Sequence, residues 1–214
     1  MNSLSATEPD SHLSTRCSTT GDELPLCIRR TAHHRRTAWW SDEIVDLSGL
    51  GRLLGGSALT DTSVGVPDGH YTDESMRVTA VPTRNAIMLS VAAGVAVAAK
   101  ADTVAFGAHA GDHTIYPDCR PGFLEQLART IRVGNEGFLV EDFQLVAPFL
   151  TVTKTDIVTA AAEMGVPFEL TWSCYKGGDV HCGTCGTCWE RREAFERAGI
   201  TDPTRYAAAP TRER

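Results

Sequence analysis

Four cysteines near the C-terminus constrain the fold of this chain more than any other feature. They follow the spacing C-x7-C-x2-C-x2-C within fifteen residues, at Cys174, Cys182, Cys185 and Cys188. A C-x2-C turn brings two thiolates to one point, and zinc takes four such ligands in a tetrahedron at ~2.3 Å. Nearby glycines allow the tight turns that this requires, at positions 177, 178, 183 and 186. Because four thiolates fill the shell, the spacing predicts a structural zinc site, one per chain, rather than a catalytic one.

Other interpretations of the cysteines remain open from spacing alone. An iron–sulfur cluster also takes four thiolates. A redox C-x2-C pair is disfavoured, because it leaves two of the four thiols unexplained. His181 could replace one thiolate, but its place beside Cys182 favours an exposed histidine. The three other cysteines have no partner pattern and are expected to be ordinary thiols, at positions 17, 27 and 119.

Charge and hydropathy limit the classes of partner. The formal net charge of −7 disfavours a broad nucleic-acid surface, which needs clustered Lys and Arg. No apolar run reaches the ~18–20 residues of a membrane span. The N-terminus has no basic segment followed by an apolar stretch, so no secretory signal is expected. These features predict a cytoplasmic protein with no membrane and no direct nucleic-acid partner, in which clustered thiols bind metal rather than form disulfides.

The composition changes abruptly near Trp40. Residues 1–40 contain no Val, Phe, Tyr, Lys or Gln, and Ser, Thr, Arg and His are abundant. Such a segment has little apolar surface to offset the entropy of ordering, so we expect residues 1–40 to be atypical and poorly ordered. A transit peptide also fits basic, Ser-rich sequence, but four acidic residues disfavour it. We expect residues 41–214 to form one domain that includes the zinc motif 174–188.

Strand and helix patterns alternate from residue 41 onward. Short apolar or extended runs predict strands at 43–47, 78–81, 103–107 and 144–147. Helices are expected at 84–100, an almost continuously apolar stretch buried on most sides, and at 121–133. A third helix, 153–164, has a capping box from Thr153 and Asp156 and a stop at Gly165. This alternation predicts the α/β class, with a parallel sheet and flanking helices.

Two places on this framework favour anion binding. Arg84 and Asn85 lie at the start of the apolar helix, where free N–H groups suit a phosphate. Asp118 and Arg120 lie in the loop after strand 103–107, at the sheet edge where open α/β proteins bind ligands. Lys154 begins a capped helix and is a further candidate for a phosphate contact. A solvated helix end, a plain loop and a surface lysine remain the alternatives.

These motifs together resemble the 7-cyano-7-deazaguanine synthase family. The resemblance rests on four segments in order, over roughly residues 44–203: Leu54–Thr60, Val81–Asn85, Tyr116–Pro121, and Glu169–Tyr175 with the following cysteines and 191–195. It implies an adenine-nucleotide alpha-hydrolase-like fold with one structural zinc, and commonly a homodimer. The implied activity is an ATP-dependent ligase of queuosine biosynthesis, which converts 7-carboxy-7-deazaguanine and ammonia to the nitrile. The carboxylate is adenylated, ammonia gives an amide, and a second activation permits dehydration.

The resemblance also suggests roles for the candidate residues. Arg84, Asn85, Asp118 and Arg120 are expected in the crevice, where the arginines could hold phosphate or carboxylate and Asp118 a purine-like N–H. Lys154 is expected to contact the phosphate of ATP, which such enzymes use with Mg²⁺. The products of this family are precursors of a modified tRNA base.

The chain departs from the family at its beginning. The family starts with a strand and a Ser-Gly-Gly-x-Asp-Ser loop that wraps the pyrophosphate of ATP, and no such loop occurs here. We therefore expect weak or absent ATP binding, and a coding region that is frameshifted or mis-started before Trp40. The main alternative is a catalytically impaired homologue that acts as a binding or dimer-partner protein. A zinc-ribbon nucleic-acid binder is disfavoured by the acidic charge.

Overall fold

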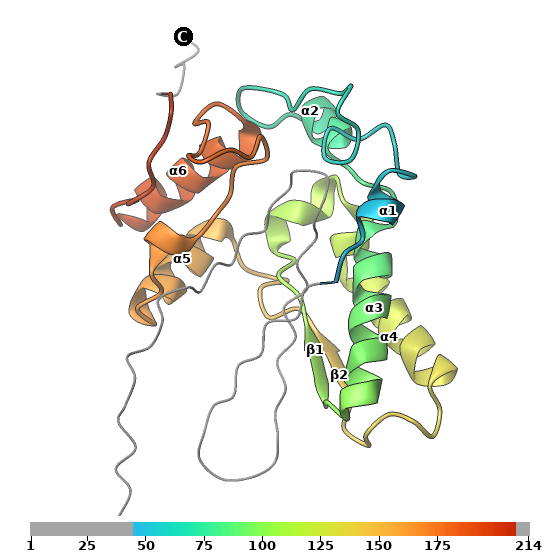
Figure 1. Ribbon diagram of the computed structural model, residues 1–214. Coiled ribbons are helices and arrows are strands. Elements are labelled where there is room, and N and C mark those ends of the chain that lie inside the picture. The colour runs from blue at the N-terminus through green and yellow to red at the C-terminus, as the bar shows by residue number, and fades with distance from the viewer. Residues whose placement is uncertain (1–44, 209–214) are drawn as a thin grey trace, which may run out of the picture.

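A computed structural model of the chain describes residues 45–208 (Figure 1). The predicted poor order of residues 1–40 therefore lies outside the described residues. In chain order the elements are α1 Ser48–Gly51, α2 Asp73–Val78, α3 Arg84–Ala99, β1 Thr103–Ala105, α4 Pro121–Gly134, β2 Gln144–Val146, α5 Lys154–Glu163 and α6 Gly186–Ala198. Short 3-10 helices span Ala110–Thr114, Pro117–Cys119 and Phe168–Leu170. No helix among these residues is long and apolar enough to cross a membrane.

The main core forms where β1 and β2 meet α3 and α4. The strands are parallel, with Val104 opposite Leu145, and α4 makes the crossover between them. Both helices pack beside this pair in Figure 1. The core residues come from all four elements and the chain next to them: Leu89, Ala92, Ala93, Ala96, Ala101, Val104, Ile131, Phe143 and Leu145. The parallel βαβ arrangement expected from the sequence is confirmed.

Helix α3 is buried on most sides, as its composition predicted. Leu89, Ala92, Ala93 and Ala96 are buried. The exposed positions of the helix recur every fourth residue and form one stripe, Ser90, Gly94 and Ala98. Small side chains on the buried face let α3 approach the sheet and α4 closely. The helix ends where Lys100 takes a left-handed conformation with φ +55°.

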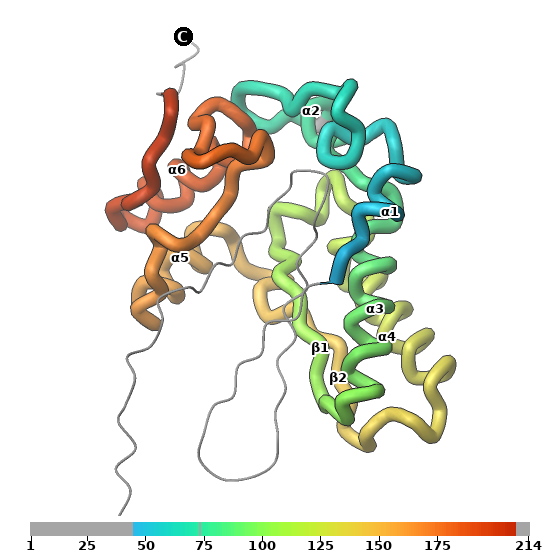
Figure 2. Tube along the Cα trace, viewed as in Figure 1, coloured from blue at the N-terminus to red at the C-terminus, as the bar shows by residue number. Residues whose placement is uncertain are grey.

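A second packing unit joins α5 to α6. Val158 from α5 packs against Ala194 and Phe195 from α6, and the Phe168 and Phe195 rings meet edge to face at 4.8 Å between centroids. The chain before α2 crosses to this unit, as the tube in Figure 2 shows. There the Gly69 N–H donates to Thr184 O at 2.8 Å. The segment around Gly69 thus packs beside the segment around Thr184, although the two are far apart in the sequence.

Two sequence expectations need correction, and three helices, α1, α2 and α6, were not predicted. The expected strand 78–81 is wrong, because Val78 is the last residue of α2, which Thr72 and Ser75 begin with a capping box. Of the expected strand 43–47, residues 43 and 44 lie outside the described part, Val45 forms an isolated bridge, and α1 starts at Ser48. Helix α6 follows the last cysteines directly. The other expected helices and strands are confirmed within one or two residues.

Candidate functional site

The four predicted cysteines converge on one point. Their Sγ atoms all lie within 4.8 Å of one another. Cys182 and Cys188 are 3.9 Å apart between sulfurs, and Cys185 and Cys188 are 3.5 Å apart. Thiolates bound to one zinc at ~2.3 Å in a tetrahedron are about 3.8 Å from each other, so the spacing fits a metal ion. Three of the four side chains are fully buried, and Cys182 is partly exposed.

The loop backbone is arranged to stabilise negative sulfur. The N–H groups of Thr184 and Cys185 both donate to Cys182 Sγ at 3.3 Å, and the Cys182 N–H donates to Cys174 Sγ at 3.3 Å. Hydrogen bonds from Cys174 and Cys188 lower the pKa of Cys185, and the pKa of Cys174 rises to about 11, chiefly through its hydrogen bond with Cys185. Crowded thiols cannot all ionise together without a cation. This donor set is one that metal ions such as zinc prefer.

His181 is buried, so the prediction of an exposed histidine is wrong. Its ring lies 4.2 Å from the Trp172 ring between centroids, and its Nε2 accepts the Ser173 N–H at 3.0 Å. Burial, followed by the charge of Arg191, lowers the pKa of His181. With Nε2 engaged by the backbone, the ring supports the cysteine loop as a neutral packing residue.

Arg191 of α6 fixes the segment that leads into Cys174. Its Nε donates to Asp202 Oδ1 at 3.2 Å, its Nη1 to Thr171 Oγ1 at 2.7 Å and its Nη2 to Phe168 O at 3.2 Å. Both partners of this ion pair are about nine-tenths buried. Buried charges are tolerated only when their hydrogen bonds are satisfied, as they are here. Arg191 thus determines where residues 168–173 lie.

The predicted crevice residues lie around the start of α3. Asn85 donates its backbone N–H to Asp118 Oδ2 and its Nδ2 to Asp118 O, both at 3.2 Å. Asn85 Nδ2 also donates to Cys119 Sγ at 3.2 Å. Burial, with the carboxylates of Asp112 and Asp118, raises the pKa of Cys119 to about 12. The structure therefore brings Asn85 and Asp118 together.

The two arginines of the predicted set differ in their surroundings. The charge of Arg84 acts on Tyr116 and Cys119, lowering their pKa values against the stronger effect of burial. Arg120 is exposed, and it donates to His113 O at 2.7 Å and to Thr114 O at 3.1 Å. Arg120 therefore closes the loop between β1 and α4 through backbone carbonyls.

Lys154 pairs with Glu190, which is not among the site residues predicted from the sequence. Its Nζ forms an ion pair with Glu190 of α6, and both side chains are about a third exposed. Partly exposed pairs contribute only ~0–1 kcal/mol, so an incoming anion can replace the carboxylate at little cost. His109, just after β1, is buried nearby, and its Nδ1 accepts the Gly111 N–H at 3.0 Å. Burial lowers the pKa of His109.

An apolar cavity of about 540 Å³ opens between α5 and α6. We call it the α5–α6 cavity. Its walls include Ile157 and Ala161 of α5, Trp172, and Phe195 of α6, with Lys154 and His109 at the end nearest β1. Ligand pockets typically measure roughly 300–1,000 Å³ and combine apolar walls with a few polar groups. This cavity has that size and character.

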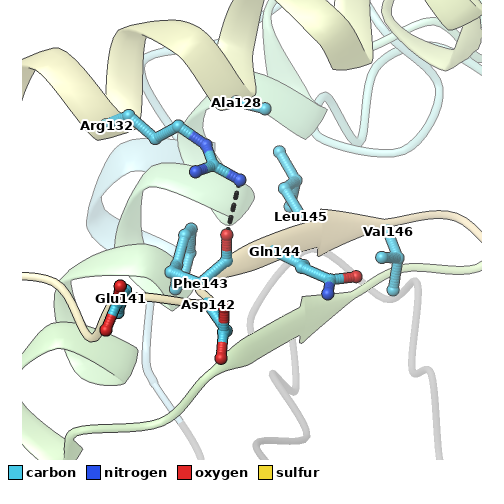
Figure 3. A pocket seen from close by; sticks show the side chains of 8 residues that line it. All are labelled: Ala128, Arg132, Glu141, Asp142, Phe143, Gln144, Leu145 and Val146. Carbon is cyan, nitrogen blue, oxygen red and sulfur yellow. Dashed lines mark hydrogen bonds between the residues drawn. The ribbon is translucent and has the colours of Figure 1, made fainter.

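A second hollow, of about 450 Å³, lies at β2 and is shown in Figure 3. Its polar side chains are Glu141, Asp142, Gln144 and Arg132, and Arg132 donates to Phe143 O at 2.6 Å. The arginine is thus engaged with the backbone, and the carboxylates give the hollow an acidic rim. It is a poor place for an anion.

The sequence pattern of the family described as "Queuosine biosynthesis protein QueC" matches residues 27–199. The chain belongs to the QueC family. Its fold is accordingly adenine-nucleotide alpha-hydrolase-like, and β1, β2 and their helices are the part of that fold in residues 45–208. The resemblance inferred from the motifs is confirmed.

Curated relatives support the same assignment to QueC. A protein of Allorhizobium ampelinum, named 7-cyano-7-deazaguanine synthase, is 58% identical over 164 residues, covering 77% of this chain and 68% of the relative. Proteins of Mesorhizobium japonicum and Brucella ovis, named 7-cyano-7-deazaguanine synthase 1 and 7-cyano-7-deazaguanine synthase, are each 58% identical over 167 residues. Each of these two matches covers 78% of this chain and 71% of the relative.

Glu190 and the α5–α6 cavity are the features of this QueC chain that the sequence did not reveal. Glu190 follows Cys188 by two residues, so its place at the start of α6 could have been inferred had that helix been recognised. The cavity depends on how α5 packs against α6, and no local pattern reports this packing.

Proposed function

We propose that this chain is a 7-cyano-7-deazaguanine synthase. In that reaction ATP activates the carboxylate of 7-carboxy-7-deazaguanine, ammonia gives the amide, and a second activation allows dehydration to the nitrile. The observation that carries the proposal is 58% identity to proteins of that name over most of the chain, with all four cysteines converging. The alternative of an impaired binding protein is not favoured by this level of identity.

Zinc is the metal we propose for the four-cysteine cluster. Four thiolates at tetrahedral spacing leave no position for a reacting water, which supports a structural role. The ion would hold the loop between Cys174 and Cys188 onto α6. We also propose that the protein acts in the cytoplasm on small molecules, without direct contact with nucleic acid, and as a homodimer.

For the nucleotide, we propose the region around the start of α3 and Lys154. Arg84, Asn85, Asp118 and Arg120 surround the former, and the observed bonds between Asn85 and Asp118 give it a fixed shape. Lys154 would meet a phosphate there, since its partly exposed ion pair with Glu190 is easily exchanged. ATP would bind with Mg²⁺, which offsets phosphate charge.

One assay tests the function directly. Zinc-loaded protein is incubated with 7-carboxy-7-deazaguanine, ammonium, Mg²⁺ and ATP. The products are then separated and identified by mass spectrometry. We expect the nitrile to appear only when ATP and ammonium are both present. If no amide or nitrile forms at millimolar ATP, the synthase proposal fails. Calorimetric titration with ATP separately tests the predicted weak affinity, which a micromolar dissociation constant would contradict.

A further inference from the structure

The α5–α6 cavity has a chemical asymmetry that defines its ligand. Most of its wall is apolar, from Ile157, Val158 and Ala161 on one side to Phe195 on the other. The polar groups in its wall are largely engaged with the protein. Trp172 Nε1 donates to Cys174 O at 2.8 Å. A ligand filling this space must therefore bury a mainly apolar, ring-like body.

The end of the cavity nearest β1 is different, because it carries a cation. Lys154 lines it, and its ammonium group pairs with Glu190, which approaches from α6. His109 is buried beside it. A ligand with an apolar ring system and one anionic group at its end would match both parts, with the anion taking the place of Glu190 against Lys154.

The Ser173 hydroxyl adds a directional contact within the cavity. Ser173 Oγ accepts a 3.4 Å hydrogen bond from Arg191 Nη1, and within residues 45–208 no acceptor takes its proton. A ring nitrogen or carbonyl of the ligand could accept that proton. The hollow in Figure 3 offers none of this, since its arginine is engaged and its rim is acidic.

We propose that the α5–α6 cavity binds a planar heteroaromatic carboxylate, with its ring between α5 and α6 and its carboxylate on Lys154. The inference rests on the proposed function, under which this ligand is 7-carboxy-7-deazaguanine. The carboxylate then lies where the phosphate of ATP would reach it, so Lys154 serves both anions at the point where they react.

The experiment is calorimetric titration of zinc-loaded protein with 7-carboxy-7-deazaguanine, without ATP. Ala161→Phe fills the cavity from α5, and Thr159→Phe places the same ring on the exposed side of that helix as a control. We expect the first variant to weaken binding at least about tenfold and the second to leave it within about twofold. Zinc content and the thermal unfolding midpoint must stay at the wild-type values in both variants.

A second variant tests the charge and does not depend on filling the core. Lys154→Met should weaken binding of the acid at least about tenfold, yet leave binding of the neutral 7-carboxamide within about twofold. A purely structural role of Lys154 would weaken both ligands equally.

The outcomes separate this inference from the proposed function. The cavity assignment is overturned if Ala161→Phe binds the acid, or forms the nitrile, as well as the wild type does. It is also overturned if Lys154→Met loses equal affinity for the acid and the amide, or if the wild-type protein does not bind the acid. Binding without nitrile formation would sustain the cavity and refute the synthase.

Discussion

At the scale of single residues, the ion pair between Arg191 and Asp202 is a sensitive contact, because both side chains are about nine-tenths buried. Replacing Arg191 with Met leaves Asp202 buried without its partner and frees Thr171 and Phe168 O. We expect a loss of about 3–5 kcal/mol in the free energy of unfolding, measured by urea titration. The matched control is Arg197→Ala, whose exposed pair with Glu193 should be worth ~0–1 kcal/mol. Equal losses in the two variants would contradict this assignment.

Asp202 also makes the free energy of unfolding depend on pH. Burial alone would raise the pKa of Asp202, but hydrogen bonds from Tyr206 and Thr204 and the charge of Arg191 bring it below its ordinary 3.8. A depressed carboxyl pKa gives stability that is fully present above pH 3.8 and is lost as the pH falls through the lower value. We expect unfolding free energy to fall more between pH 5 and about 3 in the wild type than in Asp202→Asn. Parallel pH curves would refute this.

The proposed metal site makes a further residue-scale prediction. Cys185→Ser should abolish stoichiometric zinc binding, because a hydroxyl is a poor substitute for a thiolate, and should lower the thermal midpoint. Cys119→Ser is the control, since Cys119 is buried but lies outside the cluster and only accepts from Asn85. Metal content by mass spectrometry distinguishes them. Full zinc occupancy in Cys185→Ser would exclude it as a ligand.

The positions of candidate residues could be predicted best where the pattern was local. The cysteines lie within fifteen residues, and their convergence follows from turn geometry. The partnership of Lys154 with Glu190 joins residues 36 positions apart, and depends on the packing of α5 against α6. His181 was mistaken for a surface residue because nothing adjacent in sequence announces that Trp172 and Tyr206 cover it.

At the scale of elements, the effect of a Gly→Ala substitution on stability depends on whether the glycine lies in a helix or in the cysteine loop. Gly94 lies exposed inside α3, with no heavy atom within 4 Å of an added Cβ, so Gly94→Ala should stabilise the fold by ~0.5–1 kcal/mol. Gly183 has φ +82°, and an added Cβ would overlap the carbonyl oxygen of Ala208. Gly183→Ala should therefore cost at least ~1–2 kcal/mol from backbone strain alone. Urea unfolding of the two variants should give shifts of opposite sign; equal signs would disprove the argument.

Helices with the usual start signals were predictable, and helices with unusual ones were not. The capping box of Thr153 and Asp156 gave the start of α5 correctly. The box of Thr72 and Ser75 uses Ser in place of the usual Glu or Gln, so the sequence does not predict α2 and favours a strand at Val78 instead. Helix α6 has few apolar residues, and its N-cap is a residue of the cysteine cluster, Cys185, whose side chain makes no capping hydrogen bond.

At the scale of the whole molecule, the cysteine loop fastens segments from both ends of the described chain. The Gly69 N–H bonds to Thr184 O, and those of Ala207 and Ala208 bond to His181 O and Cys182 O. Removing the metal should therefore speed amide hydrogen exchange around residues 66–71 and 206–208 as well as in the loop. The α3 and β1 core should be unchanged. Exchange measured by mass spectrometry before and after chelation tests this, and uniform acceleration across the chain would refute it.

The contact between Asp68 and the cysteine loop has a consequence for how the chain is made. Asp68 pairs with Lys176, 108 positions later, and a Cβ on Gly186 would overlap the ring of Tyr71. During synthesis the early segment must leave the ribosome long before the surface that receives it exists. Its docking has to wait until the last cysteine has emerged and the loop has closed. With zinc as the ion proposed for the cysteines, its supply to the nascent chain would govern when the segment from Asp68 to Tyr71 can dock.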